Sequence, residues 1–258
     1  MDVVNFFKFI EQKYPEYDYA TFSKKPGRSY PIEGEGELID GIRYGKFITY
    51  RQGGRIERIE TYEDGLENGK STLFHDNGVV SSEGYFVNGI RQGELTTYRE
   101  DGTKNRMHTY KNNLINGPYK EYYEDGTLKS EGVHGKVEGR NIFGHGDVGT
   151  KIDYFRNGNL QRIKNYDTDE FIKYYETGVK ELERIKIDDD DNYKLIAYHP
   201  NGNLSSIKHF QIRQEEKLVS PSIVTTVRTK VLHGENIYYD INGNERVREL
   251  FRDGKFIK

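Results

Sequence analysis

Three consecutive stretches of 24 residues repeat one pattern: residues 45–68 (GKFITYRQGGRIERIETYEDGLEN), 69–92 (GKSTLFHDNGVVSSEGYFVNGIRQ) and 93–116 (GELTTYREDGTKNRMHTYKNNLIN). Each stretch begins with glycine, carries an aromatic residue five positions later and has glycine again nine positions later. A fixed period of this length is typical of repeat proteins, in which small similar units stack on one another. The period therefore predicts an array of units and disfavours a globular α/β enzyme.

The same spacing extends to the end of the sequence. Both positions are kept in units that begin at residues 45, 69, 93, 117, 149, 169, 193 and 234. The aromatic residues of the first column are Tyr50, Phe74, Tyr98, Tyr122, Tyr154, Tyr174, Tyr198 and Tyr239. The glycines are Gly54, Gly78, Gly102, Gly126, Gly158, Gly178, Gly202 and Gly243. A second aromatic column holds Tyr62, Phe86, Tyr110, Tyr166, Phe210 and Phe251, and is interrupted by His134 and Lys186. Such columns predict ladders of rings between neighbouring units.

Asn-Gly and Asp-Gly pairs mark the expected turns. They stand at residues 40–41, 64–65, 68–69, 77–78, 88–89, 101–102, 116–117, 125–126, 157–158, 201–202, 242–243 and 253–254. These residue types accept the positive φ angles of tight hairpin turns. Each unit is therefore predicted as a β-hairpin, with a strand of about six residues, a turn and a strand of about eight. The predicted fold is all-β, an elongated twisted antiparallel sheet formed as a β-hairpin meander, with a short N-terminal helix.

The first 36 residues depart from the repeat. Val3, Phe6, Phe7 and Ile10 fit one face of a helix that ends at Pro15. We interpret residues 1–36 as a helical cap over the first hairpin, followed by a lead-in strand at residues 32–39. A helix that docks on a partner or on a membrane surface is the alternative. Residues 37–258 then form the array of about eight hairpin repeats.

An insertion at residues 211–233 lengthens one interval, so that 41 residues separate the unit starts at 193 and 234. It lacks the glycine signature, but residues 223–231 are typical of an added strand that follows a turn at residues 220–222. Insertions into repeat arrays map to loops or edges, often on the binding side. The alternative is a decayed repeat that has kept its strands.

Composition limits the classes of partner. Lys and Arg total 39 against 42 Asp and Glu, a net charge of −3, so neither nucleic acid nor an anionic membrane is expected as a partner. Cysteine is absent, which excludes disulfides and thiolate chemistry and fits a reducing, cytoplasmic location. The N-terminal stretch has no basic leader, so a signal peptide is not expected.

A search for reactive groups finds no catalytic constellation. Residues 144–149 match the dinucleotide pattern G-x-G-x-x-G, but a second hairpin follows them where that chemistry needs a helix N-terminus. None of the seven histidines has metal-ligand spacing to another. We therefore predict a protein that is not an enzyme and has no cofactor, no metal and no catalytic residue.

The densest charge cluster is the run Asp188, Asp189, Asp190 and Asp191, which lies between two units. A calcium loop would alternate its acidic ligands and include a glycine, and this run does neither. Four adjacent like charges are usually a solvated loop. The functional alternative is an acidic patch that binds a basic protein partner.

The recurring G-x-x-x-x-Y/F-x-x-x-G pattern, with its Asn/Asp-Gly turns, resembles the MORN-repeat-variant family over residues 37–258. The resemblance implies a twisted antiparallel sheet and, for bacterial members with tandem repeats, an immunity or antitoxin protein that binds and neutralises a cognate toxin. We therefore expect a non-catalytic protein-binding repeat protein. The alternative is a scaffold or membrane-associated protein.

Overall fold

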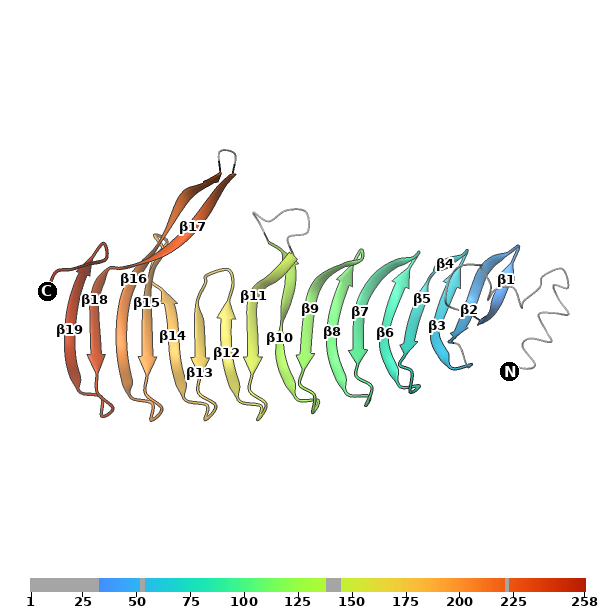
Figure 1. Ribbon diagram of the computed structural model, residues 1–258, viewed down its shortest axis with the longest axis horizontal. Coiled ribbons are helices and arrows are strands. Elements are labelled where there is room, and N and C mark those ends of the chain that lie inside the picture. Colours follow the sequence, from blue (N-terminus) through green and yellow to red (C-terminus); the bar gives the residue numbers. More distant parts are fainter. Residues whose placement is uncertain (1–32, 52–53, 138–144, 221–222) are drawn as a thin grey trace. The chain divides into compact units, whose positions relative to one another are not determined.

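The computed structural model describes residues 33–51, 54–137, 145–220 and 223–258, and these residues form strands, turns and no helix (Figure 1). The all-β prediction is confirmed for this part of the chain. The predicted N-terminal helix falls on residues 1–32, which lie outside the described residues. In the described ranges there is no helical segment of the length and apolarity that crossing a membrane requires.

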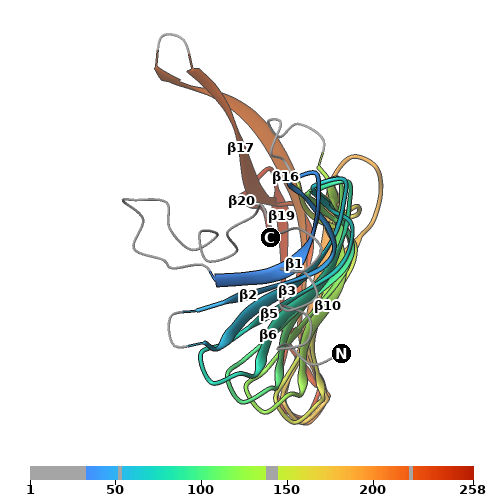
Figure 2. The same cartoon turned by 90° about the vertical axis from the view of Figure 1, so that its right-hand side faces the viewer.

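The chain divides into two compact units. Of the described residues, the first unit comprises those up to residue 126 with residues 134–136, and the second comprises residues 127–133 with those from residue 137 onward. Strand β10 (Leu128–Lys136) contributes residues to both. In each unit the strands form a single layer (Figures 1 and 2).

The first unit is an antiparallel meander in which each strand pairs with its neighbours in sequence. Its first strand confirms the predicted lead-in strand. Strands β4 and β5 follow each other directly, and both pair with β3. Only Asn68 separates them. The strands are β1 (Glu33–Ile39), β2 (Ile42–Tyr50), β3 (Ile56–Glu63), β4 (Leu66–Glu67), β5 (Gly69–Phe74), β6 (Val80–Val87), β7 (Ile90–Tyr98), β8 (Lys104–Lys111) and β9 (Leu114–Tyr122).

The second unit continues the same hairpin pattern with one long hairpin added. Its strands are β11 (His145–Tyr154), β12 (Leu160–Asn165), β13 (Phe171–Tyr174), β14 (Lys180–Lys186), β15 (Asn192–Tyr198), β16 (Leu204–Ser220), β17 (Ile223–Leu232), β18 (Gly234–Tyr239), β19 (Glu245–Arg252) and β20 (Lys255–Phe256). Strand β16 pairs with β15, with β17 and, near its start, with β18. The insertion therefore does contain the predicted added strand, and the β16–β17 hairpin extends beyond the other turns of this unit (Figures 1 and 2).

The Asn/Asp-Gly pairs fall into three structural classes. At residues 40–41, 64–65, 88–89 and 253–254 both φ angles are positive, which is typical of two-residue type I′ hairpin turns. At residues 77–78, 101–102, 125–126, 157–158, 201–202 and 242–243 only the glycine has a positive φ. The prediction of turns at 68–69 and 116–117 is wrong, because Gly69 begins β5 and Gly117 lies inside β9.

The turns of the second class link one repeat to the next. In the first unit the amide of Asn77 donates to the carbonyl of Glu100, 2.7 Å away, while its side-chain oxygen accepts from the amide of Val79 at 3.0 Å. Asn157 and Asn201 make the equivalent bonds to Glu176 and Ile241 in the second unit. The asparagine therefore closes its own turn and also ties that turn to the following repeat.

The interior is thin and largely aromatic, as the composition indicates. Fully or nearly buried side chains include Phe47, Tyr119, Tyr193 and Phe210. The second aromatic column is interleaved with cations, because Arg91 lies over the rings of Phe86 and Tyr110, and Lys230 lies 4.0 Å from the ring of Phe210. Ring stacking and cation–π contacts thus replace the aliphatic core of a layered domain.

Candidate functional site

The acidic run forms the turn between β14 and β15 in the second unit. Asp188, Asp189 and Asp190 are exposed and Asp191 is half-buried. The turn is closed by a backbone hydrogen bond from Ile187 to the carbonyl of Asn192, 2.8 Å long. The sequence prediction of a turn at this place is therefore confirmed.

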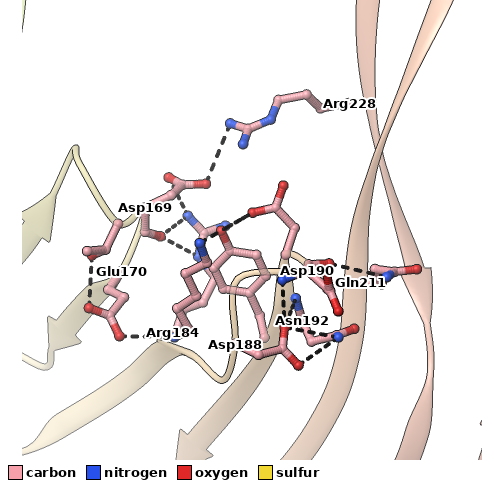
Figure 3. Close-up of polar contacts among 12 residues, drawn as sticks. Asp169, Glu170, Arg184, Asp188, Asp190, Asn192, Gln211 and Arg228 are labelled. Atoms are coloured by element: carbon pink, nitrogen blue, oxygen red, sulfur yellow. Dashed lines mark hydrogen bonds and ion pairs between the residues drawn. The ribbon is translucent and has the colours of Figure 1, made fainter.

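Asp188 organises the turn. Its Oδ1 accepts hydrogen bonds from the backbone amides of Asp190 and Asn192 at 3.0 and 3.3 Å, and its Oδ2 accepts from Nδ2 of Asn192 at 2.9 Å (Figure 3). The bond from the Asn192 side chain is the main reason that the pKa of Asp188 lies below its usual value. Asp188 therefore acts as a local cap that fixes the turn.

The other three carboxylates differ in their partners. Asp191 accepts a hydrogen bond from the Tyr193 hydroxyl at 3.2 Å and lies 3.8 Å from Nζ of Lys186. The carboxylates of Asp189 and Asp190 make no hydrogen bond or ion pair with the described residues, although the carbonyl of Asp190 accepts from the Gln211 amide. Of the predicted patch, two carboxylates are thus engaged inside the protein and two face solvent.

A mostly buried cation lies beneath the turn. Nη2 of Arg184 is 2.6 Å from Oδ1 of Asp169, and its Nε donates to the Asp169 carbonyl at 2.7 Å. The guanidinium also lies over the rings of Phe171 and Tyr193, 4.9 and 5.3 Å from their centroids. Figure 3 shows Arg184 and Arg228 converging on the carboxylate of Asp169. Because Arg184 lies in β14 and contacts Tyr193 in β15, this cluster stabilises the two strands that flank the acidic turn.

A hollow of ≈ 400 Å³ adjoins the turn, lined among others by Ile187, Asp188, Tyr193, His209, Phe210 and His233. Tyr193 and Phe210 border it but are only 1% and 3% exposed, and their stacked rings lie 5.6 Å apart between centroids. At its rim the exposed side chains of Ile187 and Asp188 place an apolar group beside a carboxylate, which suits the stem and the charged head of a lysine or arginine side chain.

The sequence pointed to the acidic turn but not to the hollow. Its walls come from β15, β16 and the start of β18, and they meet where the β16–β17 hairpin departs from the sheet. The insertion at 211–233 marks that place in the sequence, but spacing alone does not say that His209 and His233 face the turn.

Two kinds of site considered in the sequence, a metal centre and a dinucleotide loop, are not formed by the described residues. No group of three or more His, Cys, Asp or Glu side chains in the described ranges could hold a metal ion. Of the G-x-G-x-x-G match, residues 145–149 lie within β11, and a turn and a strand follow, so no helix N-terminus is aimed at a phosphate. Gly144 lies outside the described residues.

The first unit contains a second group of titratable side chains. Glu60 is 2% exposed and its carboxylate accepts from Arg58 at 3.1 Å and from the Tyr62 hydroxyl at 2.8 Å. Burial, and next the hydrogen bond and negative charge of Glu60, raise the pKa of Glu67 to about 7. Burial, and next the hydrogen bond to Glu60, raise the pKa of Tyr62 to about 12. The pair of carboxyl groups is enclosed by its own partners, so we interpret it as structural.

The raised pKa of Glu67 predicts pH-dependent stability. The folded protein keeps a proton on Glu67 that the unfolded chain releases, so this contribution is complete below about pH 4.5 and is lost as the pH rises through about 7. Urea unfolding across this range should show a free energy of unfolding that falls with pH. Glu67→Gln should remove part of that slope, and equal slopes in the two proteins would contradict the assignment.

Comparison with known families identifies the repeat. Three repeats of this chain match the family model of the MORN repeat variant. The matched residues are 67–88, 115–136 and 147–168. Each match carries the first-column aromatic residue at its eighth position and the conserved-spacing glycine at its twelfth, as Phe74 and Gly78 do in the first. The MORN repeat variant thus corresponds to one strand, one turn of the second class and the returning strand.

Two curated relatives are similar to part of the chain. T-cell surface antigen CD2 of Macaca fascicularis is 27% identical over 108 residues, and that of Homo sapiens is 30% identical over 108 residues. In both cases the alignment covers 42% of this chain and 28% of the relative, so the chain spans less than a third of their length.

Similar solved structures are much larger proteins. TcdB2-TccC3 without its hypervariable C-terminal region is 12% identical, with 85% of this chain and 14% of that chain covered and a TM-score of 0.21. A Photorhabdus luminescens Tc holotoxin pore is 10% identical, with 84% and 14% covered and a TM-score of 0.18. At these TM-scores the likeness carries no argument about fold or function.

Proposed function

We propose that this chain is a non-catalytic, cytoplasmic protein-binding repeat protein whose partner presents a basic surface. The observation that carries the proposal is the acidic turn, in which the carboxylates of Asp189 and Asp190 make no hydrogen bond or ion pair with the described residues and Asp188 borders the hollow. Because Asp188 fixes the turn by its own hydrogen bonds, binding would cost little ordering entropy.

In its most concrete form, the partner is a bacterial toxin domain and the chain is its immunity or antitoxin protein. The support for this form is the resemblance of the repeats to the MORN repeat variant, together with the acidic binding turn. A basic toxin, such as a nuclease, would be steered toward the exposed carboxylates and captured quickly. A lysine or arginine side chain of the toxin would enter the hollow beside Ile187 and Asp188.

The test uses the full chain and the purified product of the neighbouring gene. We expect a complex whose affinity falls as salt rises. Asp189→Asn together with Asp190→Asn should weaken binding about tenfold, as loss of interfacial charges typically does. Asp40→Asn with Asp64→Asn removes the same charge from turns of the first unit, and asparagine accepts their positive φ, so this control should bind as the parent does.

Two outcomes would count against the proposal. If the neighbouring gene product forms no complex at modest salt, the immunity form is wrong. If a complex forms but is weakened equally by both double substitutions, the acidic turn is not the binding site. Salt-sensitive binding to liposomes, without binding to the gene product, would instead favour the scaffold or membrane-associated alternative.

A further inference from the structure

A row of exposed side chains follows the two-residue turns of the first unit, along the upper edge of its strands in Figure 1. Four members follow directly after the turns and are 24 residues apart in sequence: Ile42, Leu66, Ile90 and Leu114. Their cross-strand partners before the turns are Ile39, Glu63, Val87 and Lys111. We call these eight residues the turn row.

The turn row lies on one face of the sheet. Successive residues of a strand point to opposite faces, so the next residues in the strands, among them Arg43 and Arg91, lie on the other face. There Arg43 covers the ring of Tyr62, and Arg91 covers that of Tyr110. The turn row therefore takes no part in the cation–aromatic packing that fills the opposite face.

The row is continuous along the unit. A methyl group built on Gly65 would lie 2.9 Å from Cγ2 of Ile42, and one built on Gly89 would lie 3.7 Å from Cδ2 of Leu66. Ile42 and Leu66 thus each lie over the glycine of the following turn. Backbone hydrogen bonds hold the turns in this stack, from Gly65 to the carbonyl of Arg43 and from Gly89 to that of Glu67.

The aliphatic members remain largely uncovered. Ile39, Ile42, Leu66, Val87, Ile90 and Leu114 are 42, 48, 50, 50, 40 and 46% exposed. Together they present roughly 500 Å² of apolar surface, which is at the upper end for a single patch on a monomeric protein. A patch of this size, organised in one line, is typical of an interaction surface.

The order of residues in the row identifies its occupant. From β2 to β9 the row reads Ile42, Glu63, Leu66, Val87, Ile90, Lys111 and Leu114, one residue per strand line. This order is self-complementary about Val87, since apolar residues are placed symmetrically and the only acid mirrors the only base. We propose that the turn row binds a second copy of this chain across a two-fold axis that runs parallel to the strands over Val87.

In this dimer Val87 meets the partner's Val87, and Leu66 meets the partner's Ile90. Glu63, whose carboxylate also accepts from the Asn68 amide, meets the partner's Lys111. The Val87 pair lies on the axis and forms once, whereas every other pair forms twice, as an isologous interface requires. The two patches together would bury roughly 1,000 Å² or more, which is enough for a specific interface.

Other occupants fit the row less well. Its aliphatic residues after the turns recur every two strands, at roughly 9.5 Å. A second copy of the chain presents aliphatic residues at the same spacing along the whole row. On an α-helix, apolar side chains of one face recur every seven residues, at about 10.5 Å. Their positions would therefore fall behind those of the turn row by about 1 Å at each repeat. An anionic membrane is disfavoured by Asp40, Asp64 and Glu63, which lie in or beside the turns.

Single-cysteine variants of the full chain test the register, because the protein has no cysteine of its own. The probe is a bis-maleimide that spans about 10 Å, the separation of face-packed sheets. Val87→Cys should cross-link to a covalent dimer. Ile42→Cys and Leu114→Cys should not cross-link alone but should do so when the two variants are mixed. Lys104→Cys, an exposed site away from the row, is the control.

Charge substitutions test the interface without a cross-linker. Glu63→Lys should raise the dimer dissociation constant about tenfold in analytical ultracentrifugation, and Glu63→Lys with Lys111→Glu should restore it. Far-UV circular dichroism of each variant confirms that the sheet is intact. None of these substitutions touches Asp189 or Asp190, so the result is independent of toxin binding.

The proposal is overturned by any of three results. The full chain could sediment as a monomer at all concentrations up to about 100 μM. Val87→Cys could cross-link no more than Lys104→Cys, which would place the axis elsewhere. The folded single and double charge variants could also dimerise equally. Flotation of monomeric protein with phosphatidylcholine–phosphatidylglycerol vesicles would assign the row to a lipid surface instead.

Discussion

Arg184→Met should lower the free energy of unfolding by about 2–4 kcal/mol, because it leaves a mostly buried carboxylate without its main partner. The side chain of Arg184 is only 16% exposed and that of Asp169 is 24% exposed. Lys164 and Arg228 also lie near Asp169, at 3.7 and 3.8 Å, and they compensate part of the loss. The substitution also removes the cation that lies over the Tyr193 ring.

Urea unfolding followed by circular dichroism measures this effect, with Arg248→Met as the matched control. Arg248 forms ion pairs with Glu235 and Glu245 at 2.7 and 3.0 Å, but its side chain is 49% exposed. Exposed pairs contribute little, so the control should change stability far less than Arg184→Met does. Arg184→Lys should be intermediate, since lysine keeps the charge but lacks the planar fork. Equal losses for the two methionine variants would show that burial of Arg184 is not what matters.

Gly117→Ala should be similarly costly, at about 2–4 kcal/mol, for two reasons that add. The φ of Gly117 is 131°, a conformation that only glycine adopts without strain. A methyl group at this position would also lie 2.9 Å from Cβ of Thr109 on the paired strand β8, which overpacks the contact. Gly69 has the same relation to Thr61 at 3.1 Å, so the constraint belongs to the repeat.

Gly126→Ala separates the two contributions. Its φ is also positive, at 83°, but nothing lies within 4 Å of an added methyl group, so only backbone strain of about 1 kcal/mol is expected. In a Thr109→Gly background, Gly117→Ala should cost no more than Gly126→Ala does, because the clash has been removed. Thermal and urea unfolding of the four variants provide the comparison. A Gly117→Ala cost that is unchanged in that background would rule out the contact with Thr109 as its cause.

Both predictions concern residues whose roles the sequence did not predict. The pair Asn116-Gly117 is indistinguishable in sequence from Asn77-Gly78, yet the first lies within a strand and the second in a turn. The difference arises because Gly117 must pass close to Thr109 on the paired strand, a neighbour that lies outside the local sequence. Arg184 likewise does not occupy a position that defines the repeat. Its partners Asp169 and Tyr193 lie in a neighbouring turn and a neighbouring strand.

The sequence likewise predicted only part of the candidate site. The run of four aspartates predicted an exposed turn, and the structure places one there. That Asp188 would cap the turn while Asp189 and Asp190 remain unpaired depends on the path of the backbone between Ile187 and Asn192. The function of that turn stays a prediction until a partner is tested.

The sequence by itself determined the hairpin period, the strand class, the added strand of the insertion and most of the places where the chain turns. It did so because side-chain alternation and positive-φ residues act locally and repeat every 24 residues in the regular part of the chain. Tertiary structure alone decided which glycines serve close packing, which carboxylates are neutralised and which aliphatic residues remain exposed along the turns. Those properties depend on the strand that lies alongside, and a one-dimensional pattern does not specify the contacts between side chains of adjacent strands.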